Sequence, residues 1–498
     1  MKNKAELLRS LSFGARVAEE EAESLKRYFV ETDQWQRIRK GEIDIVLGDK
    51  GAGKSAIYTL IKTSENEFIK ENRTIIASAE NPQGQTVFQN LQTSPPTTEG
   101  EFINLWKLYS LTLVAKALLE EGITNKPIKE VTDRLSELGL IEESASLSRI
   151  LRSIRKYLYE RAKAKPTSVE YSITLDAITQ TASAGRKTEL SYEEDSPAIG
   201  WTVDDALDQL NAGMKDAGME CWILFDRLDV AFAGNEELER NALRALLRFY
   251  IDTLSYKFIR PKIFIRSDIW DRITEGGFTE ASHITRRTGI TWDNRGLLNL
   301  VVRRMVDNRE VCEYLGVTKE DVLADFSMQE LVFYTLFPQQ VDTGPNKPTT
   351  FDWLVSRIRD GSGRSAPREL IHLLTEARDV QLQRLERGER EPDEAFLFDR
   401  LVFKEALEPV SRTRFNQTLV AEYPDLKRWL DPLKGQKTAQ NPTTLAKIWG
   451  ISEEDARGRA NSLVKVGFFE ERGGGTDTSY RVPFLYRDAL EMVQGTAE

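Results

Sequence analysis

Short apolar runs, each followed by residues with helical spacing, predict alternating strands and helices in the first part of the chain. The runs are residues 45–47, 73–80 (RTIIASAE), 222–225 and 263–265. A continuous apolar run of this length is typical of a strand that is buried on both faces of a sheet. Alternation of such strands with helices predicts an α/β fold with a doubly wound parallel sheet.

Apolar residues at helical spacing predict further helices between and after these strands. Residues 102–122 have the pattern of a helix with a buried face, and residues 145–163 that of an amphipathic helix. The polar side of the second helix is basic and contains Arg149, Arg152, Arg155, Lys156, Arg161 and Lys163. That side is either a solvated face or a contact surface for an acidic protein or nucleic acid.

The same patterns divide the chain into four predicted parts. Residues 1–40 are predicted to form a charged helical segment, and residues 41–296 the core, with a helical insertion over 81–200. Residues 297–395 are predicted to form a helical lid. Residues 396–498 end in a helix–turn–helix pattern and two short strands around Gly473-Gly474-Gly475, which predicts a winged-helix domain.

The loop after the first predicted strand has the complete pattern of a phosphate-binding P-loop. Residues 48–55, GDKGAGKS, fit G-x-x-x-x-G-K-[ST] between a strand and a helix. In this pattern, glycines let backbone N–H groups curl around a β-phosphate, and the helix adds the positive end of its dipole. The predicted nucleotide-binding residues are Gly48, Asp49, Lys50, Gly51, Ala52, Gly53, Lys54 and Ser55. Lys54 would reach the β- and γ-phosphates and Ser55 would ligate Mg²⁺; the alternative is a glycine-rich turn that binds nothing.

Two carboxylates are predicted on the metal side of this loop, at the end of a neighbouring strand. The sequence CWILFDRLDVAF, residues 221–232, runs from a buried strand into Asp226 and then Asp229. We predict that Asp226 holds Mg²⁺ through water and that Asp229 polarises the attacking water, although Asp229 is alternatively a turn residue. Arg227 stands where many fast P-loop ATPases carry a glutamate, so we expect slow hydrolysis.

Two later segments supply further residues that would act near a γ-phosphate. The sequence RPKIFIRSDIW, residues 260–270, ends a strand with Arg266, Ser267 and Asp268. Of these, Ser267 or Asp268 is preferred for positioning the hydrolytic water. Arg368 follows Pro367 at the start of a predicted helix, where the helix dipole favours acids instead. It is predicted either to reach towards the γ-phosphate or to be a plain surface arginine.

Composition excludes several other classes of protein. Two cysteines provide no disulfide framework or cysteine zinc site, and two histidines leave little room for histidine catalysis. No apolar run approaches the roughly 18 residues of a membrane span, and the N-terminus is charged where a signal peptide would be apolar. The net charge of −10 argues against a general nucleic-acid binder. We therefore expect a soluble cytoplasmic protein without a membrane partner.

The base of the nucleotide is predicted by elimination. The guanine-reading pattern Asn-Lys-x-Asp is missing from the sequence, because the nearest string, Asn346-Lys347-Pro348-Thr349, lacks the aspartate and follows no strand. The transporter-type signature Leu-Ser-Gly-Gly-Gln is missing as well. The expected cofactors are therefore ATP and Mg²⁺.

The order of these motifs resembles a known family. A P-loop, a strand ending D-x-x-D, a polar strand end, a lid with Pro-Arg and a winged helix are similar to the AAA+/STAND-type ATPases related to origin-recognition initiators. More narrowly, SFGARVAEEEAESLKRYFVET near the N-terminus and the string PRELI resemble bacterial P-loop ATPases often encoded in mobile and phage-defence loci. The resemblance begins at Ser12, covers most of the chain and implies Phe13 and Gly14 as contacts of the adenine base.

The resemblance also implies assembly driven by ATP. In such folds an arginine from a neighbouring subunit commonly completes the γ-phosphate site, because it neutralises charge in the transition state. The candidates are the adjacent Arg286 and Arg287, with Arg287 preferred. The alternative is that both belong to a solvated strand end.

These observations favour one function over two others. We expect an ATP-binding, slowly hydrolysing switch that forms a homo-oligomer and acts with a separate protein effector in bacterial anti-phage defence. A DNA-associated, initiator-like ATPase is the alternative, and a nucleotide-scavenging hydrolase acting alone is the third reading. Nucleic acid is the less favoured partner, because the second helix of the helix–turn–helix begins with Ser452-Glu453-Glu454-Asp455, whose carboxylates would repel phosphates.

Overall fold

The computed structural model describes residues 4–16, 18–80, 88, 98–141, 146–163, 202–228, 235–275, 277–392, 396–474 and 477–497. The chain forms two compact units. The first, called here the sheet unit, consists of Asp33–Gly48 and Lys54–Gly289. The second, the C-terminal unit, consists of Met1–Thr32, Asp49–Gly53 and Ile290–Glu498. The predicted N-terminal segment 1–40 is therefore divided between the two units.

A parallel sheet is the centre of the sheet unit. Among the described residues it has five strands in the order β2-β3-β4-β1-β5, and each pair of neighbours is parallel. The strands are β1 (Ile45–Gly48), β2 (Thr74–Ser78), β3 (Glu220–Phe225), β4 (Ile259–Arg266) and β5 (Arg287–Gly289). The four predicted strands are confirmed, whereas β5 was not predicted because its sequence, Arg-Thr-Gly, has no apolar run. The predicted α/β parallel fold is confirmed.

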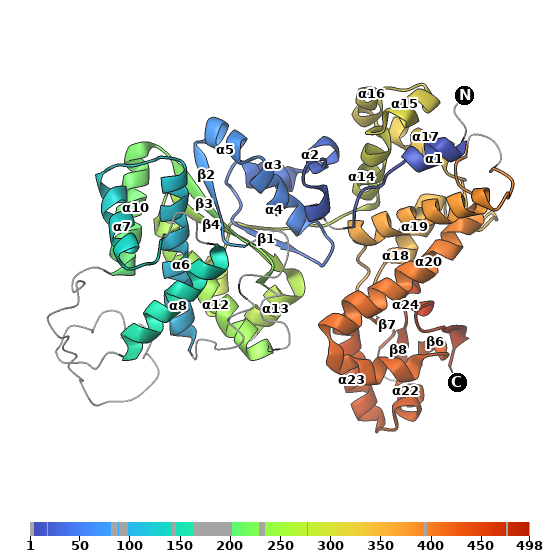
Figure 1. The fold of residues 1–498 in the computed structure, drawn as a ribbon. Helices are drawn as coiled ribbons and strands as arrows, with labels where there is room; N and C mark the ends of the chain where they lie inside the picture. Colours follow the sequence, from blue (N-terminus) through green and yellow to red (C-terminus); the bar gives the residue numbers. More distant parts are fainter. Residues whose placement is uncertain are drawn as a thin grey trace. The chain divides into compact units, whose positions relative to one another are not determined.

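Helices cover both faces of this sheet. The helices of the sheet unit are α3 (Asp33–Arg39), α4 (Lys54–Thr63), α5 (Glu65–Asn72), α6 (Glu99–Glu120), α7 (Lys126–Glu137), α8 (Leu147–Lys163), α10 (Val203–Ala217), α12 (Glu236–Asp252) and α13 (Ser267–Glu275); of these, α7 and α8 pack on other helices. Figure 1 shows α4 and α5 beside one face and α6 and α12 beside the other. Side chains of one strand point alternately to the two faces. On β3, Trp222 accordingly packs against Phe68 of α5 and Phe225 against Trp106 of α6, with ring centroids 5.2 and 5.8 Å apart.

The helix α6 lies inside the core of the sheet unit. Of the described helices it alone is long and apolar enough to cross a membrane, but 72% of its most apolar window is buried. Trp106 is fully buried and its indole N–H donates to the carbonyl of Ala242 on α12, at 2.9 Å. The sequence predicted a helix over 102–122 with one buried face. The structure gives a helix that is apolar around most of its circumference, because it packs on the sheet, α7, α10 and α12 at once.

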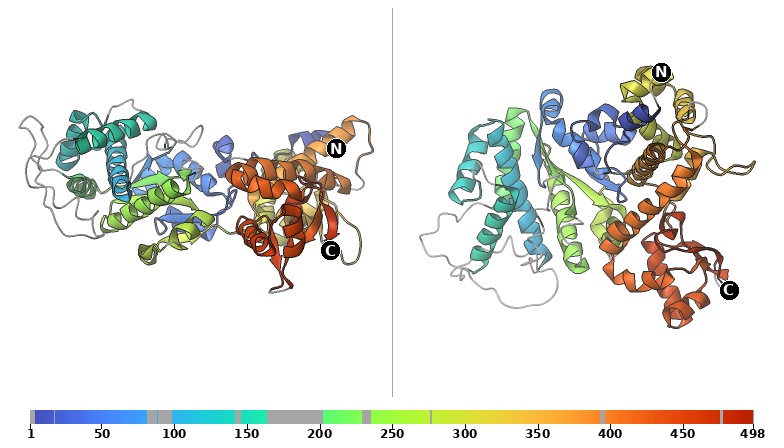
Figure 2. Two further views of the ribbon diagram at one scale, coloured as in Figure 1. Left: turned by 90° about the horizontal axis from the view of Figure 1, so that it is seen from below. Right: turned by 45° about the vertical axis from the view of Figure 1, so that its right-hand side comes forward.

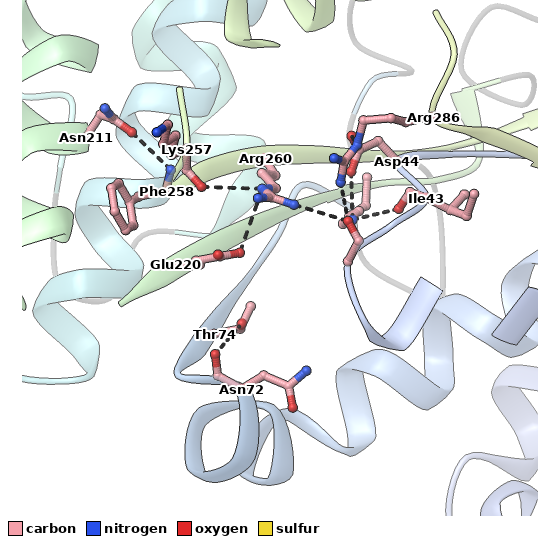
Figure 3. A network of polar contacts seen from close by, with 12 residues as sticks. Ile43, Asp44, Asn72, Thr74, Asn211, Glu220, Lys257, Phe258, Arg260 and Arg286 are labelled. Atoms are coloured by element: carbon pink, nitrogen blue, oxygen red, sulfur yellow. Dashed lines mark hydrogen bonds and ion pairs between the residues drawn. The ribbon is translucent and has the colours of Figure 1, made fainter. Parts of the chain in front are cut away.

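A buried polar network joins the amino-terminal ends of β1 and β5 to the middle of β4 in the sheet unit. Asp44, directly before β1, is 3% exposed. Its carboxylate accepts hydrogen bonds from Lys262 Nζ at 2.7 Å and from Arg286 Nε at 2.6 Å. Lys262 also donates to the carbonyl of Ile43 at 2.6 Å, and burial lowers the pKa of its ammonium to about 8. Figure 3 shows Asp44, Ile43 and Arg286 gathered at this point with Arg260 beside them. One carboxylate thus neutralises cations from β4 and from the residue before β5.

The C-terminal unit is mainly helical. Its helices are α1 (Lys4–Ser10), α2 (Leu25–Tyr28), α14 (Asn294–Val306), α15 (Arg309–Leu315), α16 (Lys319–Ala324), α17 (Phe326–Leu336), α18 (Thr350–Ile358), α19 (Pro367–Glu386), α20 (Arg400–Arg414), α21 (Lys427–Leu430), α22 (Pro442–Trp449), α23 (Glu453–Lys465) and α24 (Phe484–Arg487). The orange helices α19 and α20 lie side by side in Figure 1 and Figure 2. A turn of π-helix, Phe415–Val420, continues α20.

The end of the C-terminal unit contains the predicted helix–turn–helix and two-stranded elements. The two helices are α22 and α23, and the strands β7 (Glu470–Arg472) and β8 (Ser479–Arg481) follow as an antiparallel pair. With β6 (Lys437–Gln440) and β9 (Val493–Thr496) they form a sheet of order β7-β8-β6-β9. Ser452 caps α23 by accepting a hydrogen bond from the backbone N–H of Asp455 at 3.1 Å, so the acidic first turn has the chemistry of a helix cap.

Candidate functional site

The predicted P-loop lies between β1 and α4. Gly48 is the last residue of β1 and Lys54 the first of α4. Gly51 and Gly53 have φ of +80° and +108°, a conformation that L side chains rarely adopt, so both positions require glycine. Lys54 Nζ donates to the carbonyl of Gly48 at 2.8 Å, so its side chain folds back along the loop.

The two predicted metal-side residues lie next to each other in the sheet unit. Asp226 follows directly after β3 and is 4% exposed. The hydroxyl of Ser55, on the first turn of α4, donates to Asp226 Oδ2 at 3.0 Å. These residues are 171 positions apart in the chain. Mg²⁺ is commonly held by one or two protein oxygens together with substrate phosphates, so a hydroxyl and a carboxylate beside a P-loop fit this ion.

The residue after Asp226 has an unusual backbone. Arg227 has φ of +59°, in the left-handed region that few residues other than glycine adopt. Such conformations persist where the surrounding structure imposes them, and they cluster at functional sites. Leu228, which follows, is buried again. Asp229, predicted to polarise the attacking water, lies outside the described residues.

The end of β4 carries the other predicted water-positioning residues. Because β4 lies between β1 and β3, the residues after β4 stand between Gly48, at the end of β1, and Asp226 along the carboxyl edge of the sheet. Ser267 is the first residue of α13. Asp268 is bound by both ends of the Arg266 guanidinium, with Nε–Oδ1 and Nη2–Oδ2 distances of 2.9 Å. The Asp268 carboxylate is thus used in a two-point pair with Arg266.

Arg287 lies on the edge strand β5. Its guanidinium is 4.8 Å from the centroid of the Trp270 ring. It is paired with Ile45, three residues before the end of β1, and therefore lies about 10 Å from the carboxyl edge at which the P-loop begins. Its side chain is exposed. The proposed action of Arg287 in a neighbouring copy stays a prediction.

The middle residues of the P-loop, 49–53, belong to the C-terminal unit and pack within it. Lys50 forms an ion pair with Glu422, and Asp49 with Arg364. The indole N–H of Trp292 donates to the carbonyl of Ala52 at 2.8 Å. A Cβ on Gly51 would lie 3.0 Å from Cβ of Arg368, which is a second reason for glycine there. The predicted residues Lys50, Gly51 and Arg368 are therefore close together.

Arg368 and Lys50 also line a cavity of about 420 Å³ in the C-terminal unit. Arg368 Nε donates to the carbonyl of Arg16 at 3.2 Å. Glu369 and Arg414 form a buried pair at 2.8 Å, and burial lowers the pKa of His372 to about 4, so this imidazole is neutral at pH 7. The charged side chains of the lining are the cations Arg16, Lys50, Arg368 and Arg414 and the carboxylates Glu20 and Glu369. The excess of cations favours an anionic ligand.

The two residues implied as base contacts lie in the core of the C-terminal unit. Phe13 is 1% exposed, and its ring centroid is 6.5 Å from that of Phe337 and 6.4 Å from that of Phe398. Gly14 has φ of +87°, and a Cβ on it would lie 1.6 Å from Nη1 of Arg304. In this structure the Phe13 ring is part of the core, and Gly14 stands where a side chain would collide with Arg304.

Comparison with known proteins finds similar solved structures but no family. No protein-family model and no curated protein matches the chain. The ORC2 protein of Aeropyrum pernix, solved as ADPNP–ADP complexes, is 11% identical with a TM-score of 0.36, covering 96% of this chain and 94% of that one. Cdc6p from Pyrobaculum aerophilum is 11% identical with a TM-score of 0.26 over 92% of each chain. The ORC1 protein of Aeropyrum pernix in complex with DNA is 12% identical with a TM-score of 0.30, covering 73% and 91%. Values this low do not show that the chain belongs to their family.

One residue beside the site was missed by the sequence analysis. Glu80 lies two residues after the end of β2 and is 1% exposed. The signal was available, because an acidic residue ends the predicted strand RTIIASAE just as Asp226 ends its own strand. An acidic residue at the end of this strand points to the candidate site only when β2 is known to lie next to β3, the strand that ends before Asp226.

Proposed function

We propose that this protein is an Mg²⁺-dependent ATPase whose nucleotide site is built on residues 48–55 and Asp226. The observation that carries the proposal is the 3.0 Å contact between Ser55 Oγ and Asp226 Oδ2 directly after the P-loop. A hydroxyl and a carboxylate meeting there supply the oxygen ligands that a nucleotide-bound Mg²⁺ requires. When bound, the ion neutralises the charge that develops on the phosphates during transfer.

The residues of this site have separate roles in the proposed hydrolysis. Lys54 exchanges its bond to the carbonyl of Gly48 for the β- and γ-phosphates, and the backbone N–H groups of the loop hold the β-phosphate. Ser55 and Asp226 would hold Mg²⁺. A carboxylate takes a proton from the attacking water, and Asp229 is the candidate from the sequence. Slow turnover is proposed because Arg227 stands where fast ATPases have a glutamate.

Replacing Lys54 with alanine is expected to abolish the thermal stabilisation that Mg-ATP gives the wild type. A ligand at about 100 times its dissociation constant stabilises the folded state by about 2.7 kcal/mol, and Lys54→Ala removes the charge that meets the phosphates. The measurement is differential scanning fluorimetry with and without Mg-ATP.

The matched control is Lys62→Ala on the same helix, whose side chain is 40% exposed and which should keep the full shift. A Lys54→Ala protein that is stabilised as strongly as the wild type would refute the nucleotide site.

We further propose that the protein is an AAA+/STAND-like switch that self-assembles in the cytoplasm and acts with a separate effector in anti-phage defence. The order of motifs and the resemblance of the N-terminal and PRELI strings support this reading. Arg287 is exposed on an edge strand, which is compatible with a role in a neighbouring copy. Duplex DNA is the less favoured partner, because the first turn of α23 carries Glu453, Glu454 and Asp455.

Replacing Arg287 with alanine is expected to block hydrolysis while leaving Mg-ATP binding intact. An arginine supplied by a neighbour neutralises transition-state charge and is worth roughly 10³–10⁵ in rate. Sedimentation should show that a slow ATP analogue converts wild-type monomers to oligomers. Mixing Arg287→Ala with Lys54→Ala protein should restore some activity, because one hybrid interface combines an intact P-loop with an intact arginine.

The control for this experiment is Arg295→Ala, which removes another exposed arginine stacked on an aromatic ring, at 5.0 Å from Phe326, and should leave turnover unchanged. Unchanged monomers with and without nucleotide would eliminate self-assembly.

A further inference from the structure

Glu80 lies beside Asp226 at the carboxyl edge of the sheet. The strands β2 and β3 are parallel, with Ser78 opposite Leu224, and the N–H of Ala79 donates to the carbonyl of Leu224 at 2.9 Å. Glu80 is two residues after Ser78, and Asp226 is two residues after Leu224. Neighbouring strands lie about 5 Å apart, so the two acidic residues occupy adjacent positions at the ends of adjacent strands.

Two buried tyrosines fix the backbone at Glu80. The hydroxyl of Tyr58, on α4, donates to the carbonyl of Glu80 at 2.6 Å. The hydroxyl of Tyr109, on α6, donates to the carbonyl of Ala79 at 2.8 Å. Helices from both faces of the sheet therefore hold this short segment, and α4 is the helix that carries Lys54 and Ser55.

The electrostatic surroundings of Tyr58 place both carboxylates near its hydroxyl. Burial raises the pKa of Tyr58 well above its usual value, and the negative charges of Asp226 and Glu80 raise it further. Burial, followed by the charge of Glu80, likewise raises the pKa of Tyr109. Tyr58, a side chain of the P-loop helix, therefore feels the charges of both Glu80 and Asp226.

Glu80 is a buried carboxylate at the carboxyl edge of the sheet, 1% exposed. The position after Asp226, where a second carboxylate would otherwise stand, holds Arg227. An acid on the neighbouring strand can supply the same chemistry from the other side of Asp226.

We propose that Glu80 is the catalytic base of the ATP hydrolysis proposed above, in place of Asp229. In this step the water oxygen forms a bond to the γ-phosphorus while the bond from that phosphorus to the β–γ bridging oxygen breaks. ADP leaves with the bond electrons, the water proton passes to the Glu80 carboxylate, and Glu80 then releases it to solvent. The step needs no further reactant.

The test compares Glu80→Gln with Asp229→Asn. Glu80→Gln keeps the size of the side chain but cannot accept the proton, so turnover should fall about 10²- to 10⁴-fold while the Mg-ATP thermal shift stays at the wild-type value. The acidic limb of the pH–rate profile should disappear in Glu80→Gln and persist in Asp229→Asn. Glu71→Gln, on the exposed face of α5 in an ion pair with Arg39, is the matched control and should hydrolyse ATP as the wild type does.

The outcomes separate this proposal from the one on which it rests. A wild type without an Mg-ATP shift refutes the nucleotide site itself. A wild type that hydrolyses ATP, together with a Glu80→Gln protein that turns over at nearly the same rate, refutes the role of Glu80 alone. If Glu80→Gln does not fold, Glu80→Asp replaces it: the shortened carboxylate should retain binding and lose turnover, and unchanged turnover would overturn the proposal.

Discussion

The variant Asp44→Ala is expected to lose about 3–5 kcal/mol of unfolding free energy, because it leaves the charges of Lys262 and Arg286 without their shared carboxylate. Removing one partner of a buried ion pair is costly because the remaining charge stays desolvated. Urea denaturation at neutral pH measures the loss. Lys262 is the critical cation, since it is 1% exposed.

The loss of unfolding free energy in Asp44→Ala is expected to become smaller as the pH rises. Burial already holds the pKa of Lys262 at about 8, and Asp44 is the group that raises it most, so Asp44→Ala should lower it further. The lysine is then neutral in the folded variant at a lower pH than in the wild type. The difference in stability between wild type and Asp44→Ala should therefore shrink as the pH rises from neutral through about 8.

Two control variants test whether the unpaired buried charge causes the loss of stability. Asp133→Ala, on an exposed position of α7, should change stability little. Adding Lys262→Met to Asp44→Ala should recover part of the loss, because the unpaired cation is gone. A single Asp44→Ala protein with wild-type stability would show that the network does not hold β1, β4 and β5 together.

The variant Asp226→Asn is expected to lower Mg²⁺-dependent ATP hydrolysis about 10- to 100-fold, the usual cost of removing a group that orients a metal's ligands. The amide keeps the size of the side chain and can still meet the Ser55 hydroxyl, but it lacks the negative charge that attracts the ion. The measurement is turnover as a function of Mg²⁺ concentration at saturating ATP.

The shape of that titration distinguishes a metal role from a folding defect. Asp226→Asn should require more Mg²⁺ for half-maximal turnover and should still show a thermal shift at high Mg²⁺. The control is Asp252→Asn, a 53%-exposed carboxylate paired with Lys107, which should titrate as the wild type does. An unchanged Mg²⁺ requirement in Asp226→Asn would exclude Asp226 from the metal site.

Local sequence patterns were enough to predict the strands, loop and helix that carry most of the candidate site. The glycine-rich loop 48–55 and the apolar run ending in Asp226 were recognised because strand, loop and helix each depend on neighbouring residues. The same holds for the strand over 73–80. Phe13 was assigned to base contact by resemblance, whereas the structure buries its ring, because nothing local in the sequence distinguishes a core aromatic from a ligand contact.

By itself, the sequence determined that this chain is an α/β protein with a P-loop between a strand and a helix, since periodicity and loop chemistry are properties of short segments. Only the tertiary structure decided the order β2-β3-β4-β1-β5, which depends on packing between segments far apart in the chain. That order brings Ser55 to Asp226 and Glu80 to the position beside it. It also brings Lys262 of β4 and Arg286 to Asp44, and the buried charge of Lys262 is tolerated because that carboxylate arrives with it.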